Sequence, residues 1–279
     1  MSVKIIVDST ADLMPRVKEK VTVVPLTLHF GDEEYIDGVT ITHKEFYEKL
    51  IETDQMPHTS QATPVVFGEV FEEIKKNKDS AVVITISSKF SGTYQSAIIA
   101  AADYDDIYVV DSGSAAIGIG ILTELALEYA KSGASAKEIA QILEEEKKKI
   151  KIVALFDTLE YLKRGGRISK TVAFAGGVLN IKPVIGVENG EIVMLGKARG
   201  SKQGNNLLVA EIEKSGGVNF QRPILLGYTG LSDALLVKYI EDSRHLWVPS
   251  GKELEYTPVG SVIGTHAGPG AIAVAYFGN

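Results

Sequence analysis

Serine and threonine hydroxyls gather in three short stretches of the sequence. HTSQATP occupies 58–64, SSKFSGTYQSA occupies 87–97, and VVDSGSA occupies 109–115. The second stretch follows an apolar run that is typical of a strand, and it precedes residues that are typical of a helix. Hydroxyls in such a place can supply a nucleophile, hydrogen bonds to an anion, or a cap for the helix.

Ser91 and the residues after it combine several features of an anion site. If a helix begins here, the backbone N–H groups of Gly92, Thr93 and Tyr94 lie in its first turn and have no partner within the helix. The helix dipole favours negative charge at that end. The Ser91 hydroxyl adds a donor, and Gly92 lacks a side chain that would block close approach. The alternative interpretation is that Ser91 only caps the helix.

One histidine, His266, stands among small residues in the stretch IGTHAGPGA at 263–271. We expect a glycine-rich loop that bends sharply there. One ring nitrogen could donate a hydrogen bond to an anion, and the small neighbours leave room for a ligand. A structural role is the alternative for this histidine. It is the expected role for the histidines with ordinary surroundings, which are His29, His43, His58 and His245.

Basic residues surround a Gly-Gly turn in LEYLKRGGRISK at 159–170, namely Lys163, Arg164, Arg167 and Lys170. In an acidic chain, this cluster indicates a docking surface for an anionic group or for an acidic partner. Arg199 could add to the same surface. A solvated basic turn is the alternative interpretation.

Composition limits the classes of function. The 279-residue chain has a net charge of −7 and a pI of about 5.4, which disfavours nucleic acid as the main partner because phosphate binding needs a basic surface. The chain contains no cysteine, so it has no disulfide and no thiolate metal site. The sequence lacks the P-loop, dinucleotide-binding, nucleophile-elbow and paired-histidine zinc patterns. No signal peptide or transmembrane helix is indicated, and we expect a cytoplasmic protein without a metal or cofactor.

Strands that alternate with helices must position these residues. Apolar runs at 3–8, 81–86 and 107–112 read as strands, and segments with helical spacing lie between and after them. This alternation predicts a mostly parallel sheet covered by helices. We assign residues 1–150 to such an N-terminal α/β domain. Within it we expect one strand over 21–30 and a polar loop over 56–64.

The pattern changes near residue 151. Two strand-like runs joined by Asn189-Gly190 predict an antiparallel hairpin. The chain then ends in a predicted strand, the glycine-rich loop and a further strand over 254–278. We therefore predict a second α/β domain, residues 151–279, with a partly antiparallel sheet.

Seven motifs, taken in order, resemble those of the DegV family. They span nearly the whole chain, and although each is weak alone, their order makes the match specific. They are VDSTADL, TSQATP, SSKFSGTYQSA, YVVDS, YLKRGGRIS, KPVI followed by ENGEI, and GTHAGPGA. One departure is visible, because this chain has Ser60-Gln61-Ala62 where such proteins often have Ser-Gln-Pro. It loosens the loop and changes no proposed ligand contact.

The resemblance implies a two-domain α/β fold that holds a long-chain fatty acid between the domains. Family members with known roles are the fatty-acid-binding subunits of a bacterial fatty acid kinase, and they present the carboxylate to a separate ATP-dependent kinase subunit that makes an acyl phosphate. By this resemblance the chain is a non-catalytic, lipid-binding carrier. Thr59 and Ser91 would hold the carboxylate, with His266 beside it. Arg167 and Arg199 would lie near the kinase-facing surface or the head group.

The implied ligand contacts, together with the helix N-terminus, give a predicted set consisting of Thr59, Ser60, Ser91, Gly92, Thr93 and His266. The acyl tail would supply most of the affinity, because burying some fourteen methylenes is worth at most roughly 11 kcal/mol before ordering and association costs. Apolar stretches at 97–102, 115–127 and 172–179 could line a slot for the tail or belong to the ordinary core.

Two other functions are compatible with the same residues. Ser91 and His266 could be the nucleophile and base of a serine esterase or acyltransferase, with Asp8 or Asp111 orienting the histidine. Alternatively, the chain could be a regulatory protein in which the lipid is structural.

Overall fold

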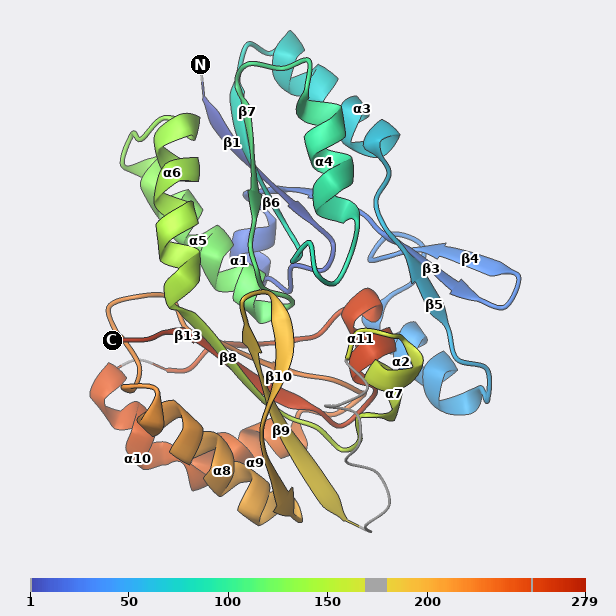
Figure 1. Ribbon diagram of the computed structural model, residues 1–279, viewed down its shortest axis with the longest axis vertical. Coiled ribbons are helices and arrows are strands. Elements are labelled where there is room, and N and C mark those ends of the chain that lie inside the picture. Colours follow the sequence, from blue (N-terminus) through green and yellow to red (C-terminus); the bar gives the residue numbers. More distant parts are fainter. Residues whose placement is uncertain (1, 169–179, 252) are drawn as a thin grey trace.

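The computed structural model describes residues 2–168, 180–251 and 253–279 (Figure 1). Within these ranges the strands form a four-stranded, a six-stranded and a three-stranded sheet. Figure 1 shows the four-stranded sheet and its helices in the upper half and the six-stranded sheet in the lower half. The predicted α/β class, with a parallel sheet early in the chain and a mixed sheet later, is confirmed. The division into domains at residue 150 stays a prediction.

The four-stranded sheet is parallel throughout. Its order is β2 (Thr22–Val24), β1 (Val3–Asp8), β6 (Ser80–Thr85) and β7 (Ile107–Asp111). Its two faces are covered by the helices α3 (Pro64–Lys76), α4 (Thr93–Ala101), α5 (Ile117–Lys131) and α6 (Ala136–Glu146). In β1, Ile5 and Val7 pack in the core cluster of α5 and α6, whereas Ile6 packs in that of α3 and α4. Burial on both faces explains the continuous apolar runs.

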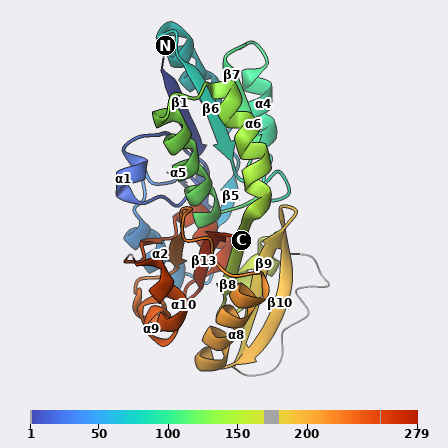
Figure 2. The ribbon, with the colours of Figure 1, turned by 90° about the vertical axis from the view of Figure 1, so that its left-hand side faces the viewer.

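The six-stranded sheet is mixed. Its order is β10 (Glu191–Arg199), β9 (Ile181–Glu188), β8 (Ile150–Leu155), β13 (Ile272–Phe277), β11 (Leu225–Tyr228) and β12 (Tyr256–Pro258). Three helices, gathered at the lower end in Figure 2, pack on this sheet: α8 (Ser201–Lys214), α9 (Ala234–Asp242) and α10 (Arg244–Trp247). The predicted hairpin is confirmed, since β9 and β10 pair antiparallel and Asn189 and Gly190 both have positive φ.

A three-stranded antiparallel sheet corrects two sequence-based predictions. It consists of β4 (Glu33–Ile36), β3 (Thr27–Phe30) and β5 (His58–Ser60), and α2 (His43–Glu52) packs on it. The single strand predicted at 21–30 is wrong, because β2 and β3 belong to different sheets and Pro25, which lacks an N–H, separates them. The polar loop predicted at 56–64 is also wrong, because it contains the edge strand β5.

Short helices connect the remaining elements, namely α1 (Pro15–Lys18), η1 (Lys147–Lys149), α7 (Glu160–Arg164), η2 (Val248–Ser250) and α11 (Ser261–Ala267). The last of these corrects the predicted glycine-rich loop, because most of it is helical. A Cβ at Gly264 would lie 2.5 Å from the hydroxyl of Tyr47, so glycine there lets α11 pack closely on α2. The chain then turns at Gly268, where φ is +70°. No helix among the described residues is long and apolar enough to cross a membrane.

Candidate functional site: an apolar cavity with one polar end

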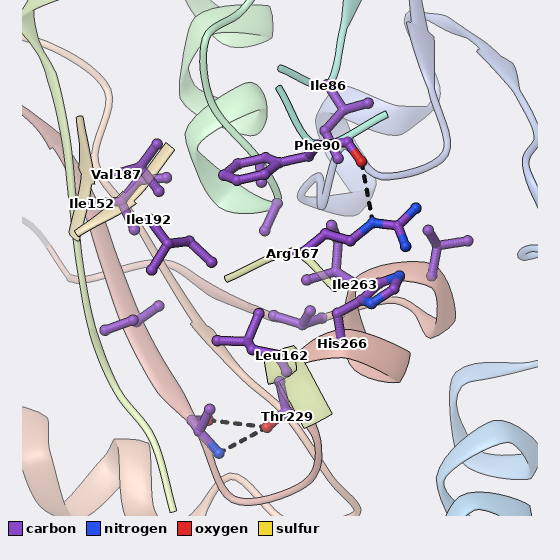
Figure 3. A pocket seen from close by; sticks show the side chains of 18 of the residues that line it. Ile86, Phe90, Ile152, Leu162, Arg167, Val187, Ile192, Thr229, Ile263 and His266 are labelled. Carbon is purple, nitrogen blue, oxygen red and sulfur yellow. Dashed lines mark hydrogen bonds between the residues drawn. The ribbon is translucent and has the colours of Figure 1, made fainter. Parts of the chain in front are cut away.

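A cavity lies between the four-stranded and six-stranded sheets (Figure 3). The empty space among its lining atoms is about 1030 Å³, including the part that is open to solvent. Most of the described side chains that line it are apolar, among them Ile86, Phe90, Ile117, Ile152, Leu162, Ile185, Val187, Ile192, Val262 and Ile263. A lining of this composition is typical of a site for a largely apolar small molecule.

Only part of the predicted apolar lining is found here. The stretch 115–127 contributes its first residues, Ala115, Ala116 and Ile117, where α5 begins. The stretch 97–102 is absent from the described lining because α4 packs with α3 in a separate core cluster. The stretch 172–179 lies outside the described residues.

Several polar side chains line the cavity and come from separate elements. Thr59 of β5 and His266 of α11 are in direct contact, with 3.0 Å between the Thr59 hydroxyl oxygen and the His266 Nε2 atom. Ser91, in the loop before α4, and Arg167, after α7, line the same cavity. The three residues expected at the carboxylate therefore line one cavity, and two of them, Thr59 and His266, are in contact although 207 residues separate them in the chain.

His266 is uncharged at neutral pH. Burial, and secondly the nearby Arg167 guanidinium, lower the pKa of the ring from 6.5 to about 4. Figure 3 shows the Arg167 side chain beside the histidine ring. The His266 Nδ1 atom is buried without a hydrogen-bond partner among the described residues. A Cβ at Gly165 would approach this atom to 2.1 Å, so glycine at that position makes room for the ring. The neutral ring carries one N–H and one acceptor nitrogen.

Arg167 reaches from solvent to the wall of the cavity. Its Nε atom donates to the Phe90 carbonyl at 3.2 Å, and its Nη1 atom donates to the Gly165 carbonyl at 2.6 Å. This places a cation at the polar end and joins the turn after α7 to the loop before α4.

The other predicted basic residues lie elsewhere. Lys163 and Arg164 are exposed and form ion pairs with Glu160 of their own helix. Arg199, at the exposed end of β10, is absent from the described cavity lining. Lys170 lies outside the described residues.

The remaining members of the predicted set differ in their positions. Ser60 lines the cavity but is exposed, and its hydroxyl lies 3.2 Å from Nε2 of His29. Thr93 is fully buried, and its hydroxyl and backbone N–H both contact the Ser91 hydroxyl, at 2.9 and 3.3 Å. The expectation of a free N–H at Thr93 is therefore wrong. Gly92 and Thr93 are absent from the described lining of the cavity.

Gln61 is a lining residue that the sequence did not reveal. Its Nε2 atom donates to the Ser96 hydroxyl at 2.8 Å, which connects β5 to α4. A Cβ at Gly92 would lie 2.1 Å from the Gln61 Oε1 atom, so glycine there accommodates the amide. The only available signal was its place directly after Thr59 and Ser60 in the first hydroxyl stretch.

The hydrogen bonds at this end do not form a serine dyad. Ser91 contacts Thr93, whereas His266 contacts Thr59. Of the two candidate orienting carboxylates, Asp8 accepts hydrogen bonds from Thr10 and Ile86, and Asp111 accepts them from Ser88 and Gly113. Among the residues that the structure describes, no three His, Asp or Glu side chains are placed to hold a metal ion. The arrangement is suited to binding an anionic head group through neutral donors and one guanidinium.

Residues 2–279 match a protein family whose description reads "Uncharacterised protein, DegV family". The chain belongs to the DegV family. The resemblance seen in the sequence motifs is thus confirmed. A DegV domain-containing protein of Caldanaerobacter subterraneus is 38% identical, and the alignment covers 98% of each chain.

Two solved structures share this fold. A DegV family protein from Thermus thermophilus, described for its fatty acid binding, has a TM-score of 0.87 with 31% identity, over 99% of this chain and 100% of that one. The Fatty Acid Kinase B3 protein of Streptococcus pneumoniae, in a crystal structure loaded with linoleic acid, has a TM-score of 0.87 with 25% identity over 100% of both chains.

Proposed function

We propose that this chain binds a long-chain fatty acid in the cavity and presents its carboxylate to a separate ATP-dependent kinase subunit, which forms an acyl phosphate. The observation that carries this proposal is the distribution of polarity, because a mostly apolar cavity contains a few hydrogen-bonding side chains, with Thr59 and His266 in direct contact. A fatty acid has the same distribution. The proposal includes the division into domains at 1–150 and 151–279, with the acyl chain between them.

The polar end is chemically suited to a carboxylate. A buried carboxylate is costly unless it is hydrogen-bonded, and the Thr59 and Ser91 hydroxyls can donate to it. His266 is neutral, and its one N–H can donate from Nε2 to the Thr59 oxygen, which leaves the Thr59 hydroxyl hydrogen for the carboxylate. Arg167 adds a cation at the same end. Donors of this kind leave the carboxylate oxygen able to react with a phosphoryl group.

The apolar part of the cavity is suited to the tail. Burial of each methylene contributes about 0.8 kcal/mol, whereas the head group mainly fixes the orientation of the ligand. Fatty acid binding is described for the DegV family protein from Thermus thermophilus, and the Fatty Acid Kinase B3 protein of Streptococcus pneumoniae was crystallised with linoleic acid.

A kinase partner is proposed from two observations. The chain is similar along its whole length to a Fatty Acid Kinase B3 protein. In addition, the exposed basic side chains of α7, Lys163 and Arg164, come shortly before Arg167 in the chain, and Arg167 lines the cavity. An acidic surface on the kinase would complement them. On this proposal the chain itself is a carrier without catalytic residues, and it acts in the cytoplasm.

Ligand binding can be tested with the protein as purified. Mass spectrometry after denaturation should detect a co-purified fatty acid, and delipidated protein should take up oleic acid. Thr59→Val should weaken oleic acid binding by roughly tenfold to a hundredfold, because it removes a hydrogen bond to a charged group. Oleyl alcohol, which lacks the charge, should bind both proteins equally. Thr53→Val is the matched control, since Thr53 lies at the end of α2 and is absent from the described lining. Folded wild-type protein that takes up no long-chain acid would refute the proposal.

The kinase step needs a separate test. Acyl phosphate should form when the loaded protein, ATP and a kinase subunit from the same organism are combined. Arg164→Glu should slow this reaction without changing oleic acid binding, because Arg164 is exposed and outside the described lining. Lys137→Glu, on an exposed position of α6, is the control with the same change of charge. Equal rates for both variants would contradict the proposed docking surface.

A further inference from the structure

The tip of the β9–β10 hairpin forms one wall of the cavity and extends beyond the six-stranded sheet. The last pairing of β9 with β8 is Gly186 with Val153. Residues 187–192, called here the ribbon tip, therefore pair only within the hairpin. Val187 and Ile192 are partners across it, and both line the cavity beside Ile152 (Figure 3). A two-stranded ribbon alone is at best marginally stable.

A buried serine fastens the ribbon tip to the four-stranded sheet. The Ser87 hydroxyl, fully buried in the loop just after β6, donates to the Gly190 carbonyl at 2.8 Å. Among the described residues, no other hydrogen bond joins the ribbon tip to another element. A Cβ at Gly190 would lie 2.5 Å from the serine oxygen. The glycine is thus required both by the turn and by the contact with Ser87.

The base of the hairpin is fixed more firmly than its tip. The pairing register shifts between Met194 and Gly196, which marks a bulge in β10. At Gly196 a Cβ would lie 2.8 Å from the Leu207 side chain, so the base packs closely on α8. The bulge therefore separates a closely packed base from a tip that has few contacts. The tip could rotate about the bulge while the base stays in place.

Passage of an apolar tail past the polar groups of the cavity would be costly. Thr59 is hydrogen-bonded to His266, and Arg167 is hydrogen-bonded to two backbone carbonyls. A tail that passed there would break these bonds without replacing them. Lifting the ribbon tip breaks one side-chain hydrogen bond and opens the apolar wall directly.

We infer that the ribbon tip is a lid through which the acyl chain enters and leaves, and that Ser87 is its latch. The inference rests on the proposed function for the identity of the ligand. It assigns a role to the Asn-Gly hairpin and to the first serine of the SSKFSGTYQSA stretch, neither of which contacts the proposed head group.

A reversible cross-link tests the lid. The Ser87 Cβ lies 3.6 Å from a Cβ placed at Gly190, within the range of about 3.5–4.5 Å found in disulfides. The chain has no cysteine, so Ser87→Cys with Gly190→Cys introduces the only two thiols. After loading with radiolabelled oleic acid, the oxidised protein should transfer it to serum albumin at least about tenfold more slowly than the same protein after reduction. Equal rates in the two redox states would overturn the inference.

A milder variant covers the case in which the double variant does not fold. Ser87→Ala removes the latch and should speed release of oleic acid about fivefold, the effect of one hydrogen bond. Ser88→Ala is the control, because Ser88 is exposed and contacts Asp111 through its backbone N–H. Release that is equally fast from both variants would count against the latch.

Hydrogen exchange separates this inference from the proposed function. The amides of the ribbon tip should exchange faster in Ser87→Ala than in Ser88→Ala, whether or not a ligand binds. If wild-type protein takes up no oleic acid, the proposed function fails while this measurement still tests the latch. If wild-type protein binds oleic acid but neither exchange nor release responds to Ser87→Ala, the lid is wrong and the proposed function stands.

Discussion

Acidification should destabilise the ligand-free protein through His266. Burial and the Arg167 cation lower the pKa of its ring from 6.5 to about 4. In the unfolded chain the ring gains a proton near pH 6.5, whereas in the folded chain it stays neutral until the pH is near 4. The neutral ring therefore contributes stability that is present above pH 6.5 and is lost as the pH falls through 4.

The magnitude follows from the difference between the two pKa values. The loss of folding stability is about 3 kcal/mol once the pH is below both pKa values. About 2 kcal/mol of this loss occurs between pH 7 and pH 4.5. His266→Gln removes the titrating ring and leaves a neutral amide. As the pH falls from 7 to 4.5, the free energy of unfolding of the wild type, minus that of the variant, should decrease by about 2 kcal/mol. Other titrating groups are present in both proteins and largely cancel in the difference.

Urea denaturation of delipidated protein at a series of pH values measures this difference. The single tryptophan, Trp247, is buried and reports unfolding by its fluorescence. His245→Gln removes an exposed histidine and serves as the control. Bound oleic acid should reduce the pH dependence, because a carboxylate beside the ring raises its pKa. A wild-type-minus-variant difference that stays constant from pH 7 to pH 4.5 would refute the buried, neutral histidine.

Three other perturbations have defined outcomes. Burial raises the pKa of Asp8 from 3.8 to about 6, so its contribution to stability is present below pH 3.8 and is lost as the pH rises through 6. The wild-type-minus-Asp8→Asn difference in unfolding free energy should therefore increase by about 2 kcal/mol from pH 7 to pH 4.5, and a flat urea series would contradict this. Gly264→Ala should lower stability by about 1–3 kcal/mol, since the added methyl group meets the Tyr47 hydroxyl. Gly68→Ala, at a helix position where a Cβ meets nothing within 4 Å, is its control, and equal melting temperatures would refute the packing argument. Leu162→Trp should fill the cavity and weaken oleic acid binding at least about tenfold, and unchanged affinity in a binding titration would place the ligand elsewhere.

The sequence by itself determined the features that depend on neighbouring residues. Runs such as Val3–Asp8 indicated strands buried on both faces, and Asn189-Gly190 fixed the hairpin turn, because both residues must adopt positive φ. The order of the motifs identified the DegV family and, by resemblance, pointed to Thr59, Ser91 and His266.

The tertiary structure alone decided which of these residues meet. It joined Thr59 to His266 and Ser87 to Gly190, and it brought Gln61 to the cavity wall. It also made α11 a helix where the small residues around His266 had predicted a loop. Gly264 is in this helix because a residue without a side chain lets it pack closely against Tyr47. A local pattern reports the conformation and buried face of its own segment. Contacts between segments far apart in the chain depend on how the sheets and helices pack, and that arrangement is what creates the cavity and gathers the polar groups at one end of it.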